Sequence, residues 1–312
     1  MDKKDIVKKL LEHGVMATPE MLGRVNEGNI NEFIGAARGA GKKNSSEAEA
    51  KILITVRKPE RKQKASVQNF IEYYNSLYSR IKDMLVKKMS AISISNAKKS
   101  FSEVSVIGMV REVAASGFVL EDPTGEIEVI LPDNNGINPD DVIGASGFVK
   151  ESRLFARELV FPDIPLTRQI AGIDATMLLA ADARAFGEIK ETDIVLAFGV
   201  GKDIKERVVL LDSSPSWVTI SKDSKELQVL VYEPGDATTA KQATEFLRKR
   251  NIPRPRSGIT SLRGPFLIDP APDIFWLVSG EKGVETYKGV TIISCGRGAA
   301  RINLKTREVV FI

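Results

Sequence analysis

The sequence predicts an α+β protein of several domains, with helices at the amino terminus, a small β-barrel in the middle and an α/β region at the end. Three observations support this fold class. The chain has 312 residues, 43% of them apolar, which gives room for two or three domains with sizeable cores. Before residue 100 apolar residues recur every three or four positions, as in helices. From residue 101 they alternate with polar residues, as in strands.

The composition excludes several classes of protein and of active site. No segment is apolar over the length of a membrane span and the amino terminus is charged, so we expect a cytoplasmic protein that binds no membrane. The net charge of +4 is too small to indicate nucleic-acid binding by itself. His13 is the only histidine, which excludes three-His zinc sites and Ser-His-Asp triads. Cys295, the only cysteine, lies in an apolar run and is expected to be a core residue.

The first 50 residues are predicted to form a helical domain followed by a linker. Residues 1–35 contain apolar residues at helical spacing, a helix stop at Gly14 and a second helix start at Thr18. Residues 36–50 are small, polar and charged without an apolar period. We therefore expect this second segment to be a flexible linker.

Residues 51–100 are predicted to be a strand and a long helix that lead into the barrel. The strand, KILITVRKP, runs into a basic segment, RKPERKQK, which is either solvated or in contact with phosphates. Ser66 is placed to cap a helix of about six turns. We expect its aromatic residues to pack rather than to stack on bases. The predicted apolar stripe consists of Val67, Phe70, Ile71, Tyr74, Tyr78, Ile81, Leu85 and Met89.

Residues 101–163 are predicted to form a barrel of five short strands. Gly108 and Gly117 lie where a small barrel must bend sharply, so the pattern matches the oligonucleotide/oligosaccharide-binding (OB) barrel. A Greek-key barrel that binds no nucleic acid is the alternative. Residues 136–163 supply two of the strands. The other three are expected at Val104–Val110, Gly117–Glu121 and Ile127–Leu131, separated by turn residues.

The aromatic residues of the barrel distinguish between two uses of such a fold. A protein that binds single-stranded DNA alone would expose aromatic side chains on the barrel. The aromatic residues here are few enough to be core residues, which argues against that use. They are Phe101, Phe118, Phe148, Phe155 and Phe161.

The remaining region, residues 164–312, contains a short polar loop between two apolar segments. The segment DIFWLVSGEKG begins like a buried strand, breaks at a Ser-Gly pair and is followed by YKGVTIISCG. We expect two strands, one on each side of a polar loop. Loops at the carboxyl ends of strands in α/β sheets are where active-site residues usually lie.

Several long segments together indicate a family. SVQNFIEYYNSLYSRIKDML, VSVIGMVRE and VLEDPTGEIEVILP resemble the helix and barrel of the small subunit of archaeal family D DNA polymerases, also called DNA polymerase II. EFLRKRNIPRPRSGITSLRGPFLIDPAPDIF, YKGVTIISCG and RINLKTREVVFI resemble the end of that subunit, and the resemblance is weakest between residues 170 and 225. It implies that residues 164–312 are a calcineurin-like phosphoesterase sandwich. In the active family members this domain holds two metal ions and acts as a 3′ to 5′ exonuclease.

The metal loops that the resemblance implies have lost their ligands in this chain. Asp182 is kept, but Arg184 stands where a metal-binding histidine is expected, and a fixed cation repels a metal. We therefore expect a degenerate domain with no catalytic residue, no metal and no cofactor. The alternative is one magnesium ion held by Asp182, Asp203, Asp212 and Glu233. The degenerate positions are Asp182, Arg184, Val200, Glu233, Trp276 and Glu281.

Two groups of basic residues are candidates for nucleic-acid binding. One precedes the barrel and the other follows a predicted helix in the last region. Either group could follow a phosphate backbone, or could be a solvated surface or a contact with an acidic partner. The candidates are Lys87, Lys88, Lys98, Lys99, Arg248, Lys249 and Arg250.

The function that the resemblance implies is structural. We expect a noncatalytic small subunit of an archaeal replicative DNA polymerase that binds the large catalytic subunit and meets DNA mainly through that complex. One alternative is a metal-dependent exonuclease with an atypical carboxylate site, and another is a stand-alone single-stranded DNA-binding protein.

Overall fold

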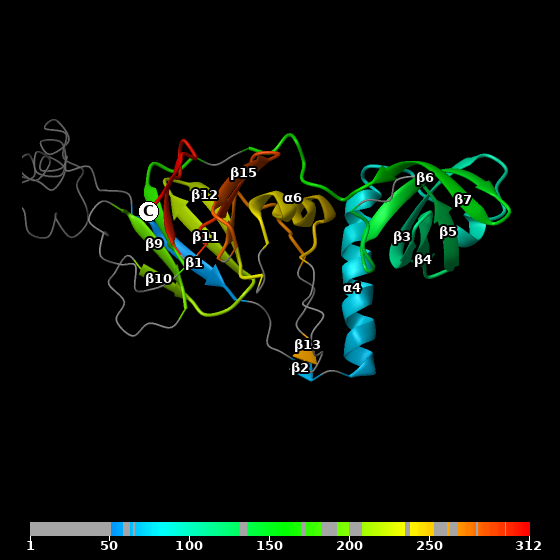
Figure 1. Ribbon diagram of the computed structural model, residues 1–312, viewed down its shortest axis with the longest axis horizontal. Helices are drawn as coiled ribbons and strands as arrows, with labels where there is room; N and C mark the ends of the chain where they lie inside the picture. The colour runs from blue at the N-terminus through cyan, green and yellow to red at the C-terminus, as the bar shows by residue number, and fades with distance from the viewer. Residues whose placement is uncertain are drawn as a thin grey trace, which may run out of the picture. The chain divides into compact units, whose positions relative to one another are not determined.

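The computed structural model describes twelve segments of the chain, beginning at residue 51 (Figure 1). The predicted helical domain and linker, residues 1–50, lie outside the described residues. The described part is mostly β structure with few helices. None of its helices is long and apolar enough to cross a membrane. The described residues are 51–58, 63–64, 66–131, 136–169, 172–181, 192–199, 208–234, 238–252, 261–262, 267–278, 280–296 and 298–312.

The long helix predicted after Ser66 is confirmed as α4 (Val67–Leu85). Ser66 has an extended backbone, and its hydroxyl oxygen accepts a hydrogen bond from the backbone N–H of Asn69 at 3.1 Å, which satisfies an otherwise unpaired donor. The buried face differs from the predicted stripe, because Val67 and Ile71 are exposed. The buried side chains follow strict four-residue spacing, so they form one line along the helix: Tyr73, Leu77, Ile81 and Leu85.

The barrel is closed and contains the five predicted strands in the order β3-β4-β5-β7-β6 (Figure 1). Its core includes Phe118, Leu120 and Ile143, and the short helix α5 (Ile94–Ala97) packs against it. Gly117 allows a close approach of two strands, since a Cβ atom there would lie 1.9 Å from the carbonyl oxygen of Val129. The strands are β3 (Glu103–Ala114), β4 (Gly117–Asp122), β5 (Gly125–Ile130), β6 (Val142–Lys150) and β7 (Arg153–Val160).

Two further sheets lie outside the barrel, and both are mixed. In the six-stranded sheet, β12, β14 and β16 run parallel to one another, and β11 and β15 run antiparallel to them. The edge strand β1 runs antiparallel to its neighbour β11. In order across the sheet its strands are β1 (Leu53–Arg57), β11 (Ser216–Lys222), β12 (Lys225–Tyr232), β14 (Ile274–Leu277), β16 (Val290–Ser294) and β15 (Gly283–Tyr287). The predicted first strand is thus confirmed, and it pairs with β11 rather than with the barrel.

The second sheet has a parallel part and an antiparallel part. Two of its inner strands are buried except for one terminal residue each, as expected for the apolar runs that form them. In order its strands are β10 (Val208–Leu211), β9 (Ile194–Phe198), β8 (Thr176–Ala180), β17 (Ala299–Asn303) and β18 (Val309–Phe311). A separate two-stranded ladder joins β2 (Gln63–Lys64) and β13 (Ser261–Leu262).

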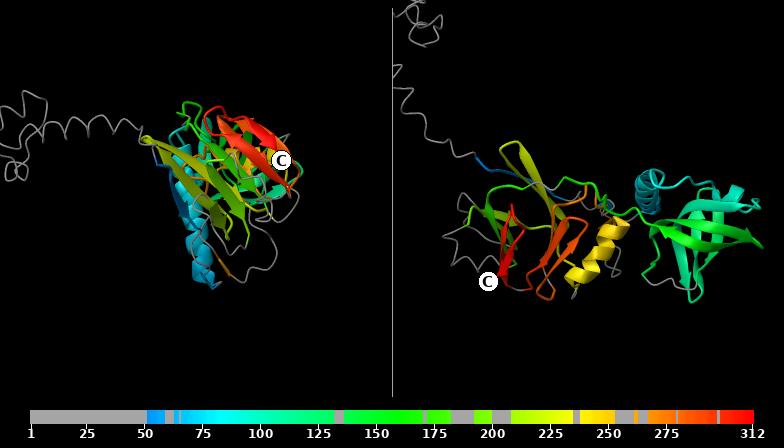
Figure 2. Two further views of the ribbon diagram at one scale, coloured as in Figure 1. Left: turned by 90° about the vertical axis from the view of Figure 1, so that its left-hand side faces the viewer. Right: turned by 90° about the horizontal axis from the view of Figure 1, so that it is seen from above.

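Helix α6 (Ala240–Lys249) covers one face of the six-stranded sheet (Figure 2, right, yellow). Thr239 and Gln242 form a reciprocal capping box at its start. The helix buries Ala243 and Leu247 against a sheet face that includes Phe275. Lys249, in the last turn of the helix, contacts Asp141, the residue just before barrel strand β6.

Strand β15 is an element that the sequence pattern did not predict. The two expected strands around SGEKG are β14 and β16, which pair parallel to each other. In the sequence β15 lies between these two strands. In the sheet it lies at the edge, where it pairs antiparallel with β16. The central residues of β15 are exposed, so it has no apolar run by which to recognise it.

Candidate functional site

Trp276, one of the degenerate metal-site positions, is a core residue. It lies on β14 and is fully buried. Asp273, just before β14, is also buried, accepts a hydrogen bond from the backbone N–H of Gln228 at 2.8 Å, and pairs with Arg168 at 3.1 Å. These two side chains of the DIFW segment are therefore part of the buried structure around the sheet.

Cys295 is buried after the end of β16, as the sequence predicts. Burial raises the pKa of its thiol to about 12, and its contacts with Trp276 and Lys282 only partly oppose this. At neutral pH the side chain is therefore a neutral thiol, which is a poor nucleophile.

The described acidic positions of the expected metal loops are exposed. Glu233 and Glu281 follow the carboxyl ends of the neighbouring parallel strands β12 and β14. Asp212 pairs with Lys58 at 2.9 Å, and the hydrogen bond from Lys58 lowers the pKa of its carboxyl group. No group of three or more His, Cys, Asp or Glu side chains in the described segments could hold a metal ion. Asp182, Arg184, Val200 and Asp203 lie outside the described residues.

Three of the seven predicted basic candidates come together in space. Lys87 and Lys88, just after α4, and Arg250, at the end of α6, line one pocket with a volume of about 410 Å³. The connector after the barrel supplies Asp163 to the same pocket. Lys98 and Lys99 follow α5, are exposed and are not part of it.

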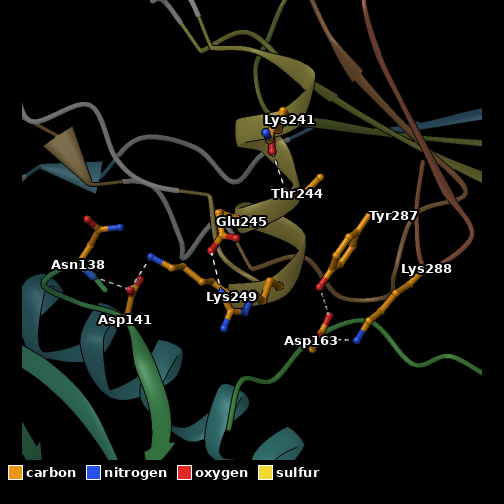
Figure 3. A network of polar contacts seen from close by, with 10 residues as sticks. Asn138, Asp141, Asp163, Lys241, Thr244, Glu245, Lys249, Tyr287 and Lys288 are labelled. Carbon is orange, nitrogen blue, oxygen red and sulfur yellow. Dashed lines mark hydrogen bonds and ion pairs between the residues drawn. The ribbon is translucent and has the colours of Figure 1, made fainter. Parts of the chain in front are cut away.

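Arg248 and Lys249 have structural partners instead. The guanidinium carbon of Arg248 lies 3.7 Å from the ring centre of Phe161, a cation–π contact. Lys249 Nζ lies 2.6 Å from Asp141 Oδ2, and less than a tenth of either side chain is exposed (Figure 3). Both basic residues thus link α6 to residues at the ends of barrel strands.

The electrostatics of the pocket are dominated by burial. Burial lowers the pKa of Lys88, and Lys288 and Arg250 lower it further, while Asp163 opposes the shift. Burial also lowers the pKa of Arg250. Both shifts mean that the positive charges are partly removed from water at a cost, which a bound anion would offset.

Asp163 is the centre of a polar network that the sequence did not predict (Figure 3). It accepts hydrogen bonds from the Tyr287 hydroxyl at 2.9 Å and from Lys288 Nζ. Burial raises the pKa of Tyr287, and its hydrogen bond to Asp163 adds to the shift. These residues lie more than a hundred positions apart, so no local pattern could reveal them.

The expectation that the barrel phenylalanines are core residues is wrong for three of them. Phe118 and Phe161 are buried, but Phe101 is fully exposed and Phe148 and Phe155 are each more than 40% exposed. Phe148 on β6 and Phe155 on β7 are directly opposite each other, so both point to the outside of the barrel. Alternation along each strand decides this, because Leu154, one residue before Phe155, faces inward.

The barrel aromatic surface consists of Phe148, Phe155 and Ile130, which lies opposite Phe155 on β5. Arg157 lies over the Phe148 ring at 4.7 Å and also pairs with Glu103 at 3.8 Å. The surface is therefore aromatic and apolar at its centre, with charges of both signs around it.

Comparison with known proteins gives partial matches. No model of a known protein family matches the chain. Three archaeal proteins described as DNA polymerase II small subunits are similar to it. The one from Archaeoglobus fulgidus is 34% identical over 110 residues (32% of this chain, 22% of the relative). Those from Thermoplasma acidophilum and Methanothermobacter thermautotrophicus are 28% identical over 191 residues (53% and 39%) and 32% identical over 115 residues (32% and 24%).

The matches thus span between about a fifth and two fifths of the length of these relatives. Among solved structures, the hypothetical protein ygiW from E. coli aligns with 23% of this chain and 89% of its own, at 20% identity and a TM-score of 0.20. That TM-score is too low to carry an argument. The sequence matches are sufficient to show that, over the matched segments, this chain is homologous to the archaeal DNA polymerase II small subunits.

Proposed function

We propose that this chain is a noncatalytic small subunit of an archaeal replicative DNA polymerase, acting in the cytoplasm by binding the large catalytic subunit and supporting DNA synthesis. Homology to DNA polymerase II small subunits supports the class of complex. In this proposal residues 101–163 are an OB barrel and residues 164–312 a calcineurin-like phosphoesterase domain without its metal ligands. DNA is met mainly through the complex.

The observation that carries the proposal is the barrel aromatic surface. Neighbouring exposed aromatic side chains are enriched where proteins bind partners. Here Phe148 and Phe155 lie side by side on a β-sheet face that holds them rigidly. The nearby arginines are already paired, Arg157 with Glu103 and Arg153 with Glu128. A surface with balanced charge suits a protein partner better than a phosphate backbone.

The proposed loss of catalysis is supported by the composition of the chain and by the partners of two carboxylates. Two-metal phosphodiester hydrolysis uses carboxylate, amide and imidazole ligands on several loops. With His13 as the only histidine, a histidine-rich site is impossible. Asp212 and Asp273 are engaged by Lys58 and Arg168. A subunit with this fold and without such a site is best explained by its surfaces.

The proposal is tested by retention of the large subunit on the immobilised full chain. Because hot-spot aromatic residues contribute about 2 kcal/mol or more, the double variant Phe148→Ser, Phe155→Ser is expected to weaken the complex at least roughly thirtyfold. Leu166→Ser, which changes a still more exposed apolar residue outside the barrel strands, is the control and should bind like the wild type. Equal retention of all three proteins would remove the barrel aromatic surface from the interface.

A second function is favoured by one observation. Exposed aromatic residues on the barrel are what a stand-alone single-stranded DNA-binding protein requires, and Phe148 and Phe155 are exposed. In that case the wild type would bind a labelled single-stranded oligonucleotide and would not bind the large subunit. The same double variant would lose affinity for the oligonucleotide. The two functions therefore predict opposite outcomes from one pair of variants.

A further inference from the structure

The pocket between the end of α4 and the end of α6 has more positive than negative charge. Its lining includes the cations Arg80, Lys87, Lys88 and Arg250. Of its carboxylates, Asp163 is neutralised by Lys288, which is not part of the lining. That leaves four cations facing Asp83 and Asp269.

Asp269 does not remove this excess. Its two oxygens contact Arg80 and Arg250, each at 3.4 Å, which is long for a charge-assisted hydrogen bond. Lys88 Nζ donates to the carbonyl oxygen of Phe161 at 3.2 Å and makes no ion pair with a carboxylate of the described residues. The pocket therefore holds cations that are only weakly compensated.

Arg250 is the residue that makes this pocket unusual. Only 5% of the residue is exposed, and only 6% of its side chain. Within the described part of the chain, its Nε and Nη1 atoms have no hydrogen-bond partner. Buried guanidinium donors are normally satisfied, because leaving them unpaired costs free energy.

The backbone of Arg250 is also strained. It adopts the left-handed conformation, with φ of 56° and ψ of 23°, at the position after a helix where glycine is usual. Arginine has no conformational advantage there, and glycine would take this conformation without strain. Burial, unpaired donors and backbone strain together indicate that the side chain is kept for what it binds.

We propose that this pocket binds a phosphate group. Arg250 and Lys88 would hold it, with Lys87 and Arg80 at the rim, because a phosphate presents several acceptor oxygens to the donors that a guanidinium and ammonium groups offer. The pocket volume of about 410 Å³ exceeds one phosphate, so there is room for an attached sugar or for the next unit of a chain.

The phosphate has two possible sources with the same chemistry: the backbone of a nucleic acid or a small phosphate compound. The homologues are DNA polymerase subunits, so a nucleic-acid backbone is the first source to test. The proposal does not depend on large-subunit binding, because none of the pocket residues belongs to the barrel aromatic surface.

The experiment measures binding of a fluorescein-labelled single-stranded oligonucleotide and, by calorimetry, of inorganic pyrophosphate to the full chain. Arg250→Gly is expected to weaken binding about tenfold and to reduce the dependence of the affinity on salt by about one phosphate contact. Because glycine suits the left-handed position, this variant is expected to keep the fold, as thermal unfolding will check. Lys87→Met with Lys88→Met is the second variant, should Arg250→Gly unfold.

Lys98→Met with Lys99→Met is the matched control. It removes two positive charges outside the pocket, as many as Lys87→Met with Lys88→Met removes from the pocket. It should bind within about twofold of the wild type. Weakening by the pocket variants alone supports the site, and the probe that they affect identifies the source of the phosphate. Equal weakening by the control, unchanged binding in the pocket variants, or no binding of either probe by the wild type would each overturn the proposal.

Discussion

Lys249 and Arg250 are neighbours in the chain with different environments. Lys249 pairs with Asp141 at 2.6 Å in a buried contact. Arg250 turns into the pocket with two donors unpaired among the described residues. One peptide bond and a change to the left-handed conformation separate an element-linking ion pair from a candidate anion site. At the scale of residues, the partner of a charge decides its role more than the charge itself.

The Lys249–Asp141 pair gives a prediction about stability. Lys249→Met leaves Asp141 buried without its cation, so the free energy of unfolding is expected to fall by about 3 kcal/mol, measured by urea denaturation. Arg111→Met, which breaks an exposed ion pair with Glu126, should change it by no more than about 0.5 kcal/mol. Burial raises the pKa of Asp141, against the attraction of Lys249. A Lys249→Met protein as stable as the wild type would mean that Asp141 is protonated in the fold.

Cys295 gives a prediction about reactivity. Since burial raises the pKa of its thiol to about 12, iodoacetamide at pH 8 should label the folded chain on the order of a thousandfold more slowly than the chain in urea. Mass spectrometry of the labelled peptide measures both rates. The unfolded thiol ionises first, so this group also reduces stability as the pH rises from about 9 toward 12. Equal labelling rates would contradict the buried position.

At the scale of elements, hydrophobic periodicity predicted whether a segment is a helix or a strand, but not which of its side chains are buried. The spacing of three or four residues after Ser66 predicted α4, but the buried line runs through Tyr73 and Leu77 instead of Val67 and Ile71. The alternation after residue 101 predicted the five barrel strands. It could not place Phe148 and Phe155 outside, because both faces of a strand carry apolar residues here and only closure of the barrel defines the inner one.

The edge hairpin shows the same limit from the other side. The residues of β15 are largely exposed, so nothing in their sequence distinguishes them from a loop. Pairing with β16 makes them a strand. An edge strand depends on its neighbour for its hydrogen bonds and contributes little to the core.

At the scale of the whole molecule, distant segments complete the sheets. β1 pairs with β11 across about 160 positions of the chain, and Asp163 binds Tyr287 and Lys288. Lys88 and Arg250, also distant in sequence, line one pocket. Such pairings bring together residues that no local pattern relates.

The absence of histidine ligands predicts the behaviour of the whole chain toward metal ions. Mn²⁺ in millimolar excess should change the melting temperature by no more than about 1 °C relative to EDTA, because only an ion bound to the folded state stabilises it. A 3′-labelled oligonucleotide should not be shortened. Stabilisation by Mn²⁺ that disappears in Asp182→Ala, together with nuclease activity, would instead support the carboxylate site.

The sequence by itself determined the kinds of element, the barrel and the family resemblance, because these depend on local periodicity and on long ordered matches. It also determined that a histidine-rich metal site is impossible, since composition decides that. Only the tertiary structure decided which phenylalanines are exposed, which basic residues are already paired and which meet in the pocket. These outcomes depend on contacts between segments far apart in the chain, and a linear pattern carries no information about the partner.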